Sequence, residues 1–307
     1  MRVTFNSFYN SLSDRFGNLN TMQQKALQQM STGQKLTVPS DDPTAMQRVL
    51  ELRTSKAQET QFWRNSGDVT SISKTSTNDL TQLNDISTRV AELTTLGSNA
   101  LNDPQSFSAY ASETDQILEQ ALTQANSRLN GKYLHGGTAT NTPPFVAVRD
   151  ASGKITSVNY VGTNAAAEAL PGGLATVRVS EDTEVAPYTN SAENTNIQSL
   201  LNNMVALRDG LAAQTPAAVS ALRPAQEAIE DSLLSTISRA GAVQYRLEVS
   251  ARQSTERFQT DEALISRDAD VDMSEASVRF SRAQTAYSAA IQSGAKIANT
   301  SLLDYIS

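Results

Sequence analysis

Val271–Ile306 reads VDMSEASVRFSRAQTAYSAAIQSGAKIANTSLLDYI, a run that no proline interrupts. Its apolar and small residues recur at alternating steps of three and four, which places them on one face of a helix. This repeat is typical of the seam of a coiled coil, which another helix must cover. We therefore predict a long C-terminal helix that needs a partner. The seam would consist of Met273, Ala276, Phe280, Ala283, Tyr287, Ala290, Gly294 and Ile297.

Residues 4–30 show the same spacing at the other end of the chain. The opposite face of this predicted helix is rich in Asn, Gln and Ser, so the helix is amphipathic. Chain ends usually fray unless something ties them down. We expect the two terminal helices to order one another, together with neighbouring subunits. The apolar face here would consist of Phe5, Phe8, Leu12, Phe16, Leu19, Met22, Ala26 and Met30.

The composition favours elongated helices over one large globular core. Of the 307 residues, 39% are hydrophobic and only 6% are aromatic. The formal net charge of −7 argues against nucleic acid or an anionic membrane surface as a partner. The absence of cysteine excludes disulfides and thiolate chemistry. No apolar run is long enough to span a membrane, and the N-terminus lacks the apolar core of a cleaved secretion signal.

Between the terminal helices, breaker residues divide the chain into a linker and long helices. Residues 31–43 contain one glycine and two prolines and are predicted to form a linker. Asp42-Pro43 then suits the start of a long helix over 44–99, because aspartate caps helix N-termini and proline fits the first turn. Asp103-Pro104 repeats that start, and we expect the return helix to end at Gly131.

Residues 132–192 change character. The stretch FVAVRDASGKITSVNYVG predicts two strands joined by a turn, and LATVRV and TEVAPY are further strand candidates. After this insertion the helical period returns, with new starts at Thr215-Pro216 and near Pro224. We predict a mainly α fold, a long antiparallel helical bundle with paired terminal helices and a small β-rich domain at the far end. The predicted domains are 1–42 with 268–307, 43–136 with 193–267, and 137–192.

Three isolated features suggest chemistry, and each has a simpler interpretation. Asp268, Asp270 and Asp272 have the spacing that opens a calcium loop, but the glycine and glutamate that the loop needs later are absent. We interpret these carboxylates as favouring the N-terminal end of the tail helix. His135, the only histidine, is expected to be solvated or locally hydrogen-bonded in a glycine-rich turn. Trp63 is expected to pack between helices, with a partner-binding role as the alternative.

Three stretches together resemble the flagellin superfamily. These are LQQMSTGQKLTVPSDDPTA near the N-terminus, NGKYLHGGT after the return helix, and the C-terminal run from Ile265 that ends in SLLDY. Filament subunits typically have Ala-Asp-Asp-Ala at the first site and end in Leu-Leu-Arg. This chain has Ser40-Asp41-Asp42-Pro43 and ends in Leu302-Leu303-Asp304-Tyr305, so it is more similar to the hook–filament junction branch of the superfamily. The β insertion has no counterpart in this resemblance.

The resemblance implies a structural protein of the bacterial flagellum rather than an enzyme. It implies a ring of identical subunits between another hook-associated protein and flagellin, with the terminal helices on the inside and the β insertion projecting outward. It further implies export by the flagellar type III apparatus, a cytosolic chaperone on the C-terminal helix, and an extracellular location. No cofactor and no metal are expected.

The residues predicted to carry assembly are the apolar positions of the two terminal helices. Two other roles stay open, a minor filament flagellin and an extracellular coiled-coil adhesin. An enzyme in the β insertion is disfavoured, because the insertion lacks any nucleophile–base or metal set. A membrane-lying N-terminal helix is disfavoured because its polar face has few Lys and Arg residues. The predicted assembly residues are Phe5, Phe8, Leu12, Phe16, Leu19, Met273, Phe280, Tyr287, Ile297, Leu302, Leu303 and Tyr305.

Overall fold

The computed structural model describes residues 5–169 and 175–306, with side chains over 10–169 and 175–296. The chain divides into two compact units. Unit 1 contains residues 1–58 and 257–307, and unit 2 contains residues 59–256. The helices are α1 (Phe5–Thr32), α2 (Pro43–Gly97), α3 (Pro104–Ala125), α4 (Ala165–Glu168), α5 (Ser191–Ala212), α6 (Pro216–Ser220), α7 (Arg223–Ala269) and α8 (Met273–Ile306). The strands are β1 (Arg128–Leu129), β2 (Lys132–Tyr133), β3 (Phe145–Arg149), β4 (Ile155–Tyr160), β5 (Val177–Ser180) and β6 (Thr183–Val185).

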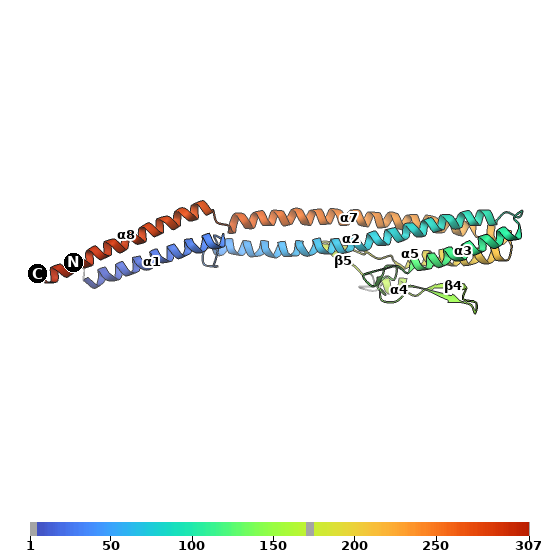
Figure 1. Ribbon diagram of the computed structural model, residues 1–307, viewed down its shortest axis with the longest axis horizontal. Helices are drawn as coiled ribbons and strands as arrows, with labels where there is room; N and C mark the ends of the chain where they lie inside the picture. The colour runs from blue at the N-terminus through green and yellow to red at the C-terminus, as the bar shows by residue number, and fades with distance from the viewer. Residues whose placement is uncertain (1–4, 170–174, 307) are drawn as a thin grey trace. The chain divides into compact units, whose positions relative to one another are not determined.

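The fold is mainly helical, as predicted. In unit 1, α1 and α8 lie side by side (Figure 1). In unit 2, residues of α2, α3, α5 and α7 enclose one core of aliphatic side chains. Leu83, Leu118, Leu200 and Leu233 come from these four helices in that order and are all buried. Burial of large aliphatic side chains is the main stabilising term for such a bundle.

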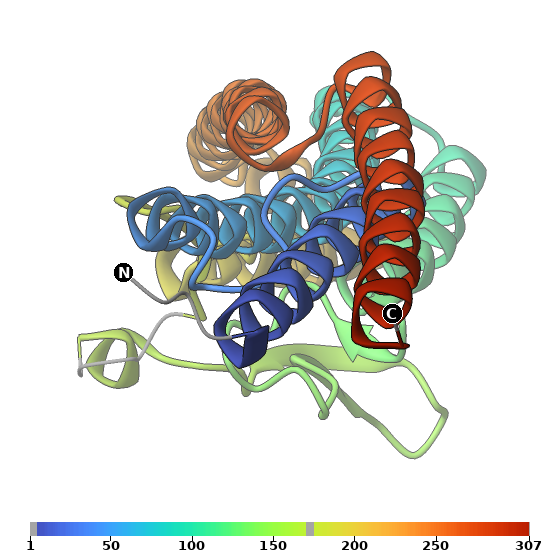
Figure 2. The same ribbon diagram turned by 90° about the vertical axis from the view of Figure 1, so that its left-hand side faces the viewer.

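The strands form three separate antiparallel hairpins rather than one sheet, counting those that the described ranges contain. The segment that carries β3 and β4 lies on one side of the helices of unit 2 (Figure 2). It is held to α5 by a reciprocal pair of hydrogen bonds, because the Val158 amide donates to Asn202 Oδ1 and Asn202 Nδ2 donates to the Val158 carbonyl. Phe145 and Ile155 from this hairpin also enter the helical core.

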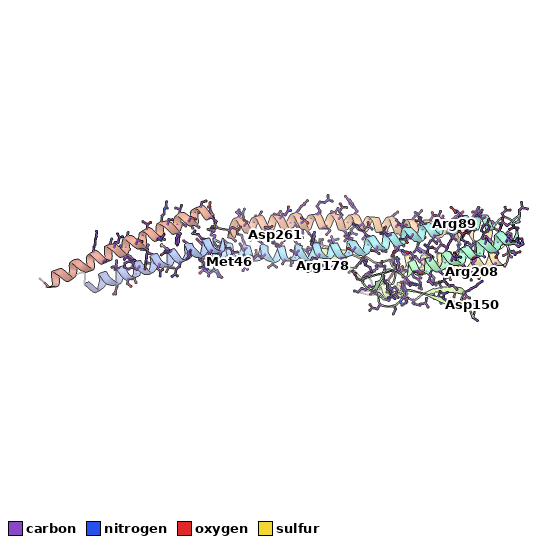
Figure 3. The ribbon with its side chains drawn as sticks, in the orientation of Figure 1. Met46, Arg89, Asp150, Arg178, Arg208 and Asp261 are labelled. Carbon is purple, nitrogen blue, oxygen red and sulfur yellow. The ribbon has the colours of Figure 1, made fainter. Side chains whose placement is uncertain are left out.

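The predicted helix starts at Pro43 and Pro104 are confirmed, and each has an aspartate cap. Asp103 Oδ1 accepts from the Ser106 amide at 2.6 Å, and Asp42 Oδ1 accepts from the Ala45 amide at 3.0 Å. These bonds satisfy backbone donors that have no partner within the helix. The strands predicted within 145–162 are also found, as β3 and β4, and Asp150 organises the turn between them (Figure 3).

The expectation that Gly131 ends the return helix is wrong. α3 ends at Ala125, and Asn130 and Gly131 have φ values of 52° and 78°. They connect β1 to β2, whose residues pair as Arg128 with Tyr133 and Leu129 with Lys132. An Asn-Gly pair with two positive φ angles is the preferred two-residue hairpin turn. The turn preference of Asn130-Gly131 therefore determines the local structure, although the apolar spacing of the preceding residues is that of a helix.

Two expectations about single side chains are also wrong. Trp63 is 56% exposed and is not buried between helices, because it lines an open groove that residues of α2 and α7 form together. His135 is fully buried rather than solvated, and its hydrogen-bond partner is distant in the sequence instead of local, with Nδ1 3.2 Å from Thr189 Oγ1. Its turn is covered by α2 and by the segment before α5, which sequence position alone does not indicate.

Candidate assembly surface

The seam between α1 and α8 is built from the predicted positions. Phe16 and Tyr287 meet edge to face, with ring centroids 6.1 Å apart and an interplanar angle of 75°. This is a favourable arrangement for aromatic rings. Ala26, Ala276 and Ala283 are buried along the same seam. The two terminal helices thus cover one face of each other.

Small residues allow the two helices to approach closely. A methyl group at Gly294 would lie 3.2 Å from Leu12 Cδ2 and 3.5 Å from Phe16 Cζ. The glycine therefore accommodates two large side chains of the opposite helix. The closeness is of the kind that knobs-into-holes packing requires.

The predicted assembly residues divide into three groups. Leu12, Phe16, Leu19, Phe280 and Tyr287 are half-buried on the paired helices. Met273 is 49% exposed at the start of α8, and Met22, which belongs to the predicted apolar face of α1, is 62% exposed. The side chains of Phe5, Phe8, Ile297, Leu302, Leu303 and Tyr305 lie outside those that the structure describes, and their role stays a prediction.

Both helices leave further large apolar side chains in solvent. Leu27 on α1 and Val278 and Ile291 on α8 are each about half exposed. Exposed aliphatic side chains are common singly, but several along one pair of helices indicate an interaction surface. Unit 1 therefore pairs its terminal helices without covering them completely.

The chain segments that enter α2 and leave α7 are joined to each other. The Lys35 amide donates to the Ala269 carbonyl at 2.6 Å, and the Val271 amide donates to the Gly33 carbonyl at 3.0 Å. A small apolar cluster lies beside this bridge, formed by Leu36, Ala45, Val49 and Ala269. The linker predicted at 31–43 is thus a fixed corner of unit 1, and sequence spacing gave no sign of these contacts.

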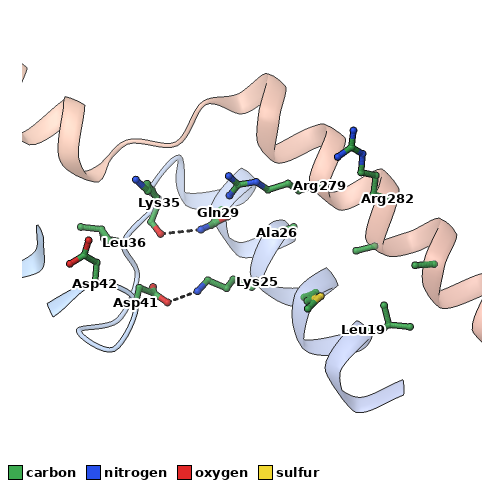
Figure 4. A pocket seen from close by; sticks show the side chains of 13 residues that line it. Leu19, Lys25, Ala26, Gln29, Lys35, Leu36, Asp41, Asp42, Arg279 and Arg282 are labelled. Atoms are coloured by element: carbon green, nitrogen blue, oxygen red, sulfur yellow. Dashed lines mark hydrogen bonds and ion pairs between the residues drawn. The ribbon is translucent and has the colours of Figure 1, made fainter. Parts of the chain in front are cut away.

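A groove of about 580 Å³ lies between this corner and the two terminal helices (Figure 4). Its apolar lining includes Leu19, Met22, Leu36 and Ala286. Its polar rim is held by two bonds, Lys25 Nζ to Asp41 Oδ1 at 2.6 Å and Gln29 Nε2 to the Lys35 carbonyl at 3.0 Å (Figure 4). The groove belongs entirely to unit 1.

Asp41 is the most strongly bound carboxylate of this groove. Besides Lys25, the amides of Thr37 and Val38 donate to its Oδ2 at 3.0 and 3.2 Å. The hydrogen bond from Lys25, with those from the loop amides, lowers the pKa of Asp41 far below its usual range. The sequence placed Asp41 in the Ser40-Asp41-Asp42-Pro43 motif but gave no sign of its structural role, because only the adjacent Asp42 has a recognisable capping position.

The three aspartates with calcium-like spacing have separate partners. Asp272 Oδ1 caps α8 through the Ser274 amide at 2.8 Å, which agrees with the predicted helix-start role. Asp268 pairs with Arg48 at 3.2 Å and with Arg267, and Asp270 accepts from the Ser266 hydroxyl at 2.6 Å. Within the described ranges no three potential metal ligands gather at one point.

Residues 3–140 of the chain match a protein-family model that is described as the bacterial flagellin N-terminal helical region. Two curated relatives are named flagellar hook-associated protein 3. The one from Salmonella typhimurium is 29% identical over 147 residues, which is 47% of this chain and 46% of the relative. The one from Escherichia coli is 26% identical over 189 residues, which is 61% of this chain and 54% of the relative.

The chain resembles flagellar hook-associated protein 3. This agrees with the flagellin-superfamily resemblance of the three sequence stretches, and it favours the junction branch over the filament subunits. The chain spans about half the length of the curated relatives that it matches. The names of these relatives are those of flagellar structural proteins, not of enzymes.

Solved structures show the same fold at low sequence identity. A flagellar hook-associated protein from Vibrio parahaemolyticus has a TM-score of 0.63 at 18% identity, covering 75% of this chain and 100% of that one. FlgL from Bacillus cereus has a TM-score of 0.57 at 17% identity, covering 69% and 97%. Among the described helices, none has the length and apolar character needed to cross a bilayer.

Proposed function

We propose that the chain is a structural component of the bacterial flagellum that assembles through α1 and α8. The observation that carries this proposal is the incomplete covering of the terminal helices. Their seam is closed by Phe16 and Tyr287, whereas Leu27, Val278 and Ile291 stay exposed on the same pair. Neighbouring subunits of an axial tube would cover such side chains, and the gain in buried apolar area would drive assembly.

The finer proposal places the chain as a ring at the junction of hook and filament. It would contact another hook-associated protein on one side and flagellin on the other. Export would follow the flagellar type III route, with a cytosolic chaperone on the C-terminal helix. The similarity to proteins named flagellar hook-associated protein 3 supports this placement. The β-rich segment 137–192 would project outward from the ring.

The position of the chain along the flagellum tests this proposal. The sequence has no cysteine, so Ala151→Cys in the exposed β3–β4 turn gives one site for a thiol-reactive dye. We expect one labelled spot per flagellum at the hook end. Label along the filament would instead show a minor flagellin, and label on the cell surface without flagellar association would contradict a flagellar role. The unsubstituted chain, which has no thiol, is the control for non-specific labelling.

A further inference from the structure

The hydrogen bonds around buried His135 fix which ring nitrogen carries the proton. The Tyr160 hydroxyl donates to the Thr163 carbonyl at 3.0 Å, so its oxygen accepts from Asn194 Nδ2, 2.9 Å away. This sets the orientation of the Asn194 amide, whose Oδ1 accepts from the Thr189 hydroxyl at 2.6 Å. Thr189 Oγ1 is then left to accept from His135 Nδ1 at 3.2 Å. The neutral ring therefore has its proton on Nδ1 and a lone pair on Nε2.

That lone pair faces a carboxylate. His135 Nε2 lies 3.9 Å from Asp79 Oδ2 and has no hydrogen-bond partner, although it is fully buried. Asp79 on α2 is also buried and accepts hydrogen bonds from Gln124 Nε2 and Ser127 Oγ. Two acceptors thus face each other across a gap without a proton between them. An unsatisfied buried acceptor is costly, so this arrangement needs an explanation.

The charged surroundings of His135 single out Asp79. The other titratable or charged groups in the elements around the hydrogen-bond chain include Tyr160 on β4, Tyr188 in the segment before α5, Glu168, which accepts from Ser191, and the Glu193–Arg239 ion pair at the start of α5. The β1–β2 hairpin that precedes His135 carries Arg128, Lys132 and Tyr133. Of the acidic groups that the structure describes, Asp79 is the one with an oxygen within 4 Å of the imidazole. Burial lowers the pKa of His135 to about 4 and raises the pKa of Asp79.

We propose that His135 Nε2 and Asp79 Oδ2 form a buried proton-binding site in unit 2. At neutral pH the imidazole is uncharged. Acid adds one proton from solvent to Nε2, which turns the two facing acceptors into a donor and an acceptor of opposite charge. The site connects α2, the turn that follows β2, and the segment before α5. The proposal concerns unit 2 alone and holds whichever assembly the chain joins.

The sign of the pH effect follows from the two states of His135. In the unfolded chain an ordinary histidine takes up a proton near pH 6.5, whereas the folded site does so only near pH 4. The contribution of His135 to stability is therefore fully present above about pH 6.5 and is lost as the pH falls towards 4. Because the Asp79 carboxylate favours the charged imidazole, its removal would push proton uptake to still lower pH.

Nuclear magnetic resonance of the full chain tests the proposal directly, because His135 is the only histidine in the sequence. With ¹³C- and ¹⁵N-labelled histidine, we expect the nitrogen shifts at pH 7 to show a protonated Nδ1 and an unprotonated Nε2. We also expect the resonance to titrate well below pH 6.5. The reverse tautomer, or a pKa near 6.5 in the folded chain, would overturn the proposal without any variant being needed.

The role of Asp79 is tested by substitution. We expect Asp79→Asn to lower the pKa of His135 by about 1 or more, a tenfold change in the ratio of charged to neutral imidazole. Asp85→Asn, which removes an exposed carboxylate from the same helix, should leave that pKa unchanged. If both variants shift it equally, or if Asp79→Asn folds and shifts nothing, the pairing is disproved. Should Asp79→Asn not fold, the wild-type tautomer and titration still decide.

Discussion

Gly131 holds a backbone conformation that other residues adopt only with strain. Its φ is 78°, and a Cβ atom there would meet nothing within 4 Å, so the conformation alone disfavours a side chain. We expect Gly131→Ala to lower the free energy of unfolding of unit 2 by about 1–2 kcal/mol. The measurement is urea denaturation followed by circular dichroism.

Gly67 provides the matched control. It lies inside α2, where a Cβ would also meet nothing within 4 Å, but without a positive φ. Alanine is a better helix former than glycine, so Gly67→Ala should stabilise the protein by about 0.5–1 kcal/mol. Equal effects of the two substitutions would contradict the assigned hairpin turn.

Asp41 should contribute stability to unit 1 in a pH-dependent way. Its pKa is lowered mainly by the hydrogen bond from Lys25, so its contribution is present above the unfolded value near 4 and is lost as the pH falls through the folded value. We expect Asp41→Asn to lower the melting temperature at pH 7, with the difference from wild type shrinking below about pH 4. Asp14→Asn, which removes an exposed carboxylate from α1, is the control and should change little. A pH-independent effect of Asp41→Asn would show that the charge is unimportant.

The α1–α8 pair is the element whose packing matters most for the proposed function. Phe16 and Tyr287 are in direct contact, so their substitutions should not be additive. In a double-mutant cycle with Phe16→Leu and Tyr287→Leu, we expect a coupling of about 0.5–1.5 kcal/mol. This coupling is measured by hydrogen exchange of the α1 and α8 amides, because the exchange rates give the free energy with which the two helices separate locally.

The exposed Ser288 beside Tyr287 gives the control for that cycle. Its side chain donates to the Gln284 carbonyl of its own helix. Phe16→Leu combined with Ser288→Ala should therefore show no coupling. A coupling as large as that with Tyr287 would mean that the two helices do not meet at these rings.

Element prediction from the sequence succeeded where one face of a helix is covered by another helix. Residues at the predicted three-and-four spacing are half-buried on the paired helices, because each helix turns its apolar face towards the other. They include Phe16, Leu19, Phe280 and Tyr287. The Asn130-Gly131 turn was missed because the apolar spacing before it continued to resemble a helix. The hairpin at 145–160 was predicted because its turn residues and strand residues agreed, whereas LATVRV and TEVAPY were predicted only as separate strands, and their pairing as β5 and β6 was not.

At the scale of the whole molecule, contacts between distant segments could not be predicted from the sequence. The bridge from Gly33 and Lys35 to the segment 269–271, the Lys25–Asp41 pair and the burial of His135 each join residues far apart in the chain. No local pattern encodes which of several polar residues finds such a partner. The same limit explains Trp63, whose exposure depends on which face of α2 the other helices cover.

We propose that the exposed apolar side chains of α1 and α8 are covered by neighbouring subunits in the flagellum. Leu27→Asp and Ile291→Asp place a charge on that surface without disturbing buried residues. Burying an unpaired charge costs well over 1.4 kcal/mol, so each variant should enter the flagellum at least about tenfold less than wild type. Gln28→Asp adds the same charge on an exposed neighbouring position and serves as the control.

The most direct measurement is the amount of each variant in purified flagella from cells that lack the wild-type copy, determined by immunoblot beside circular dichroism of the purified chain. We predict unchanged helicity for all three variants, with strong loss from flagella for Leu27→Asp and Ile291→Asp and none for Gln28→Asp. Normal incorporation of folded Leu27→Asp and Ile291→Asp would contradict assembly through this surface.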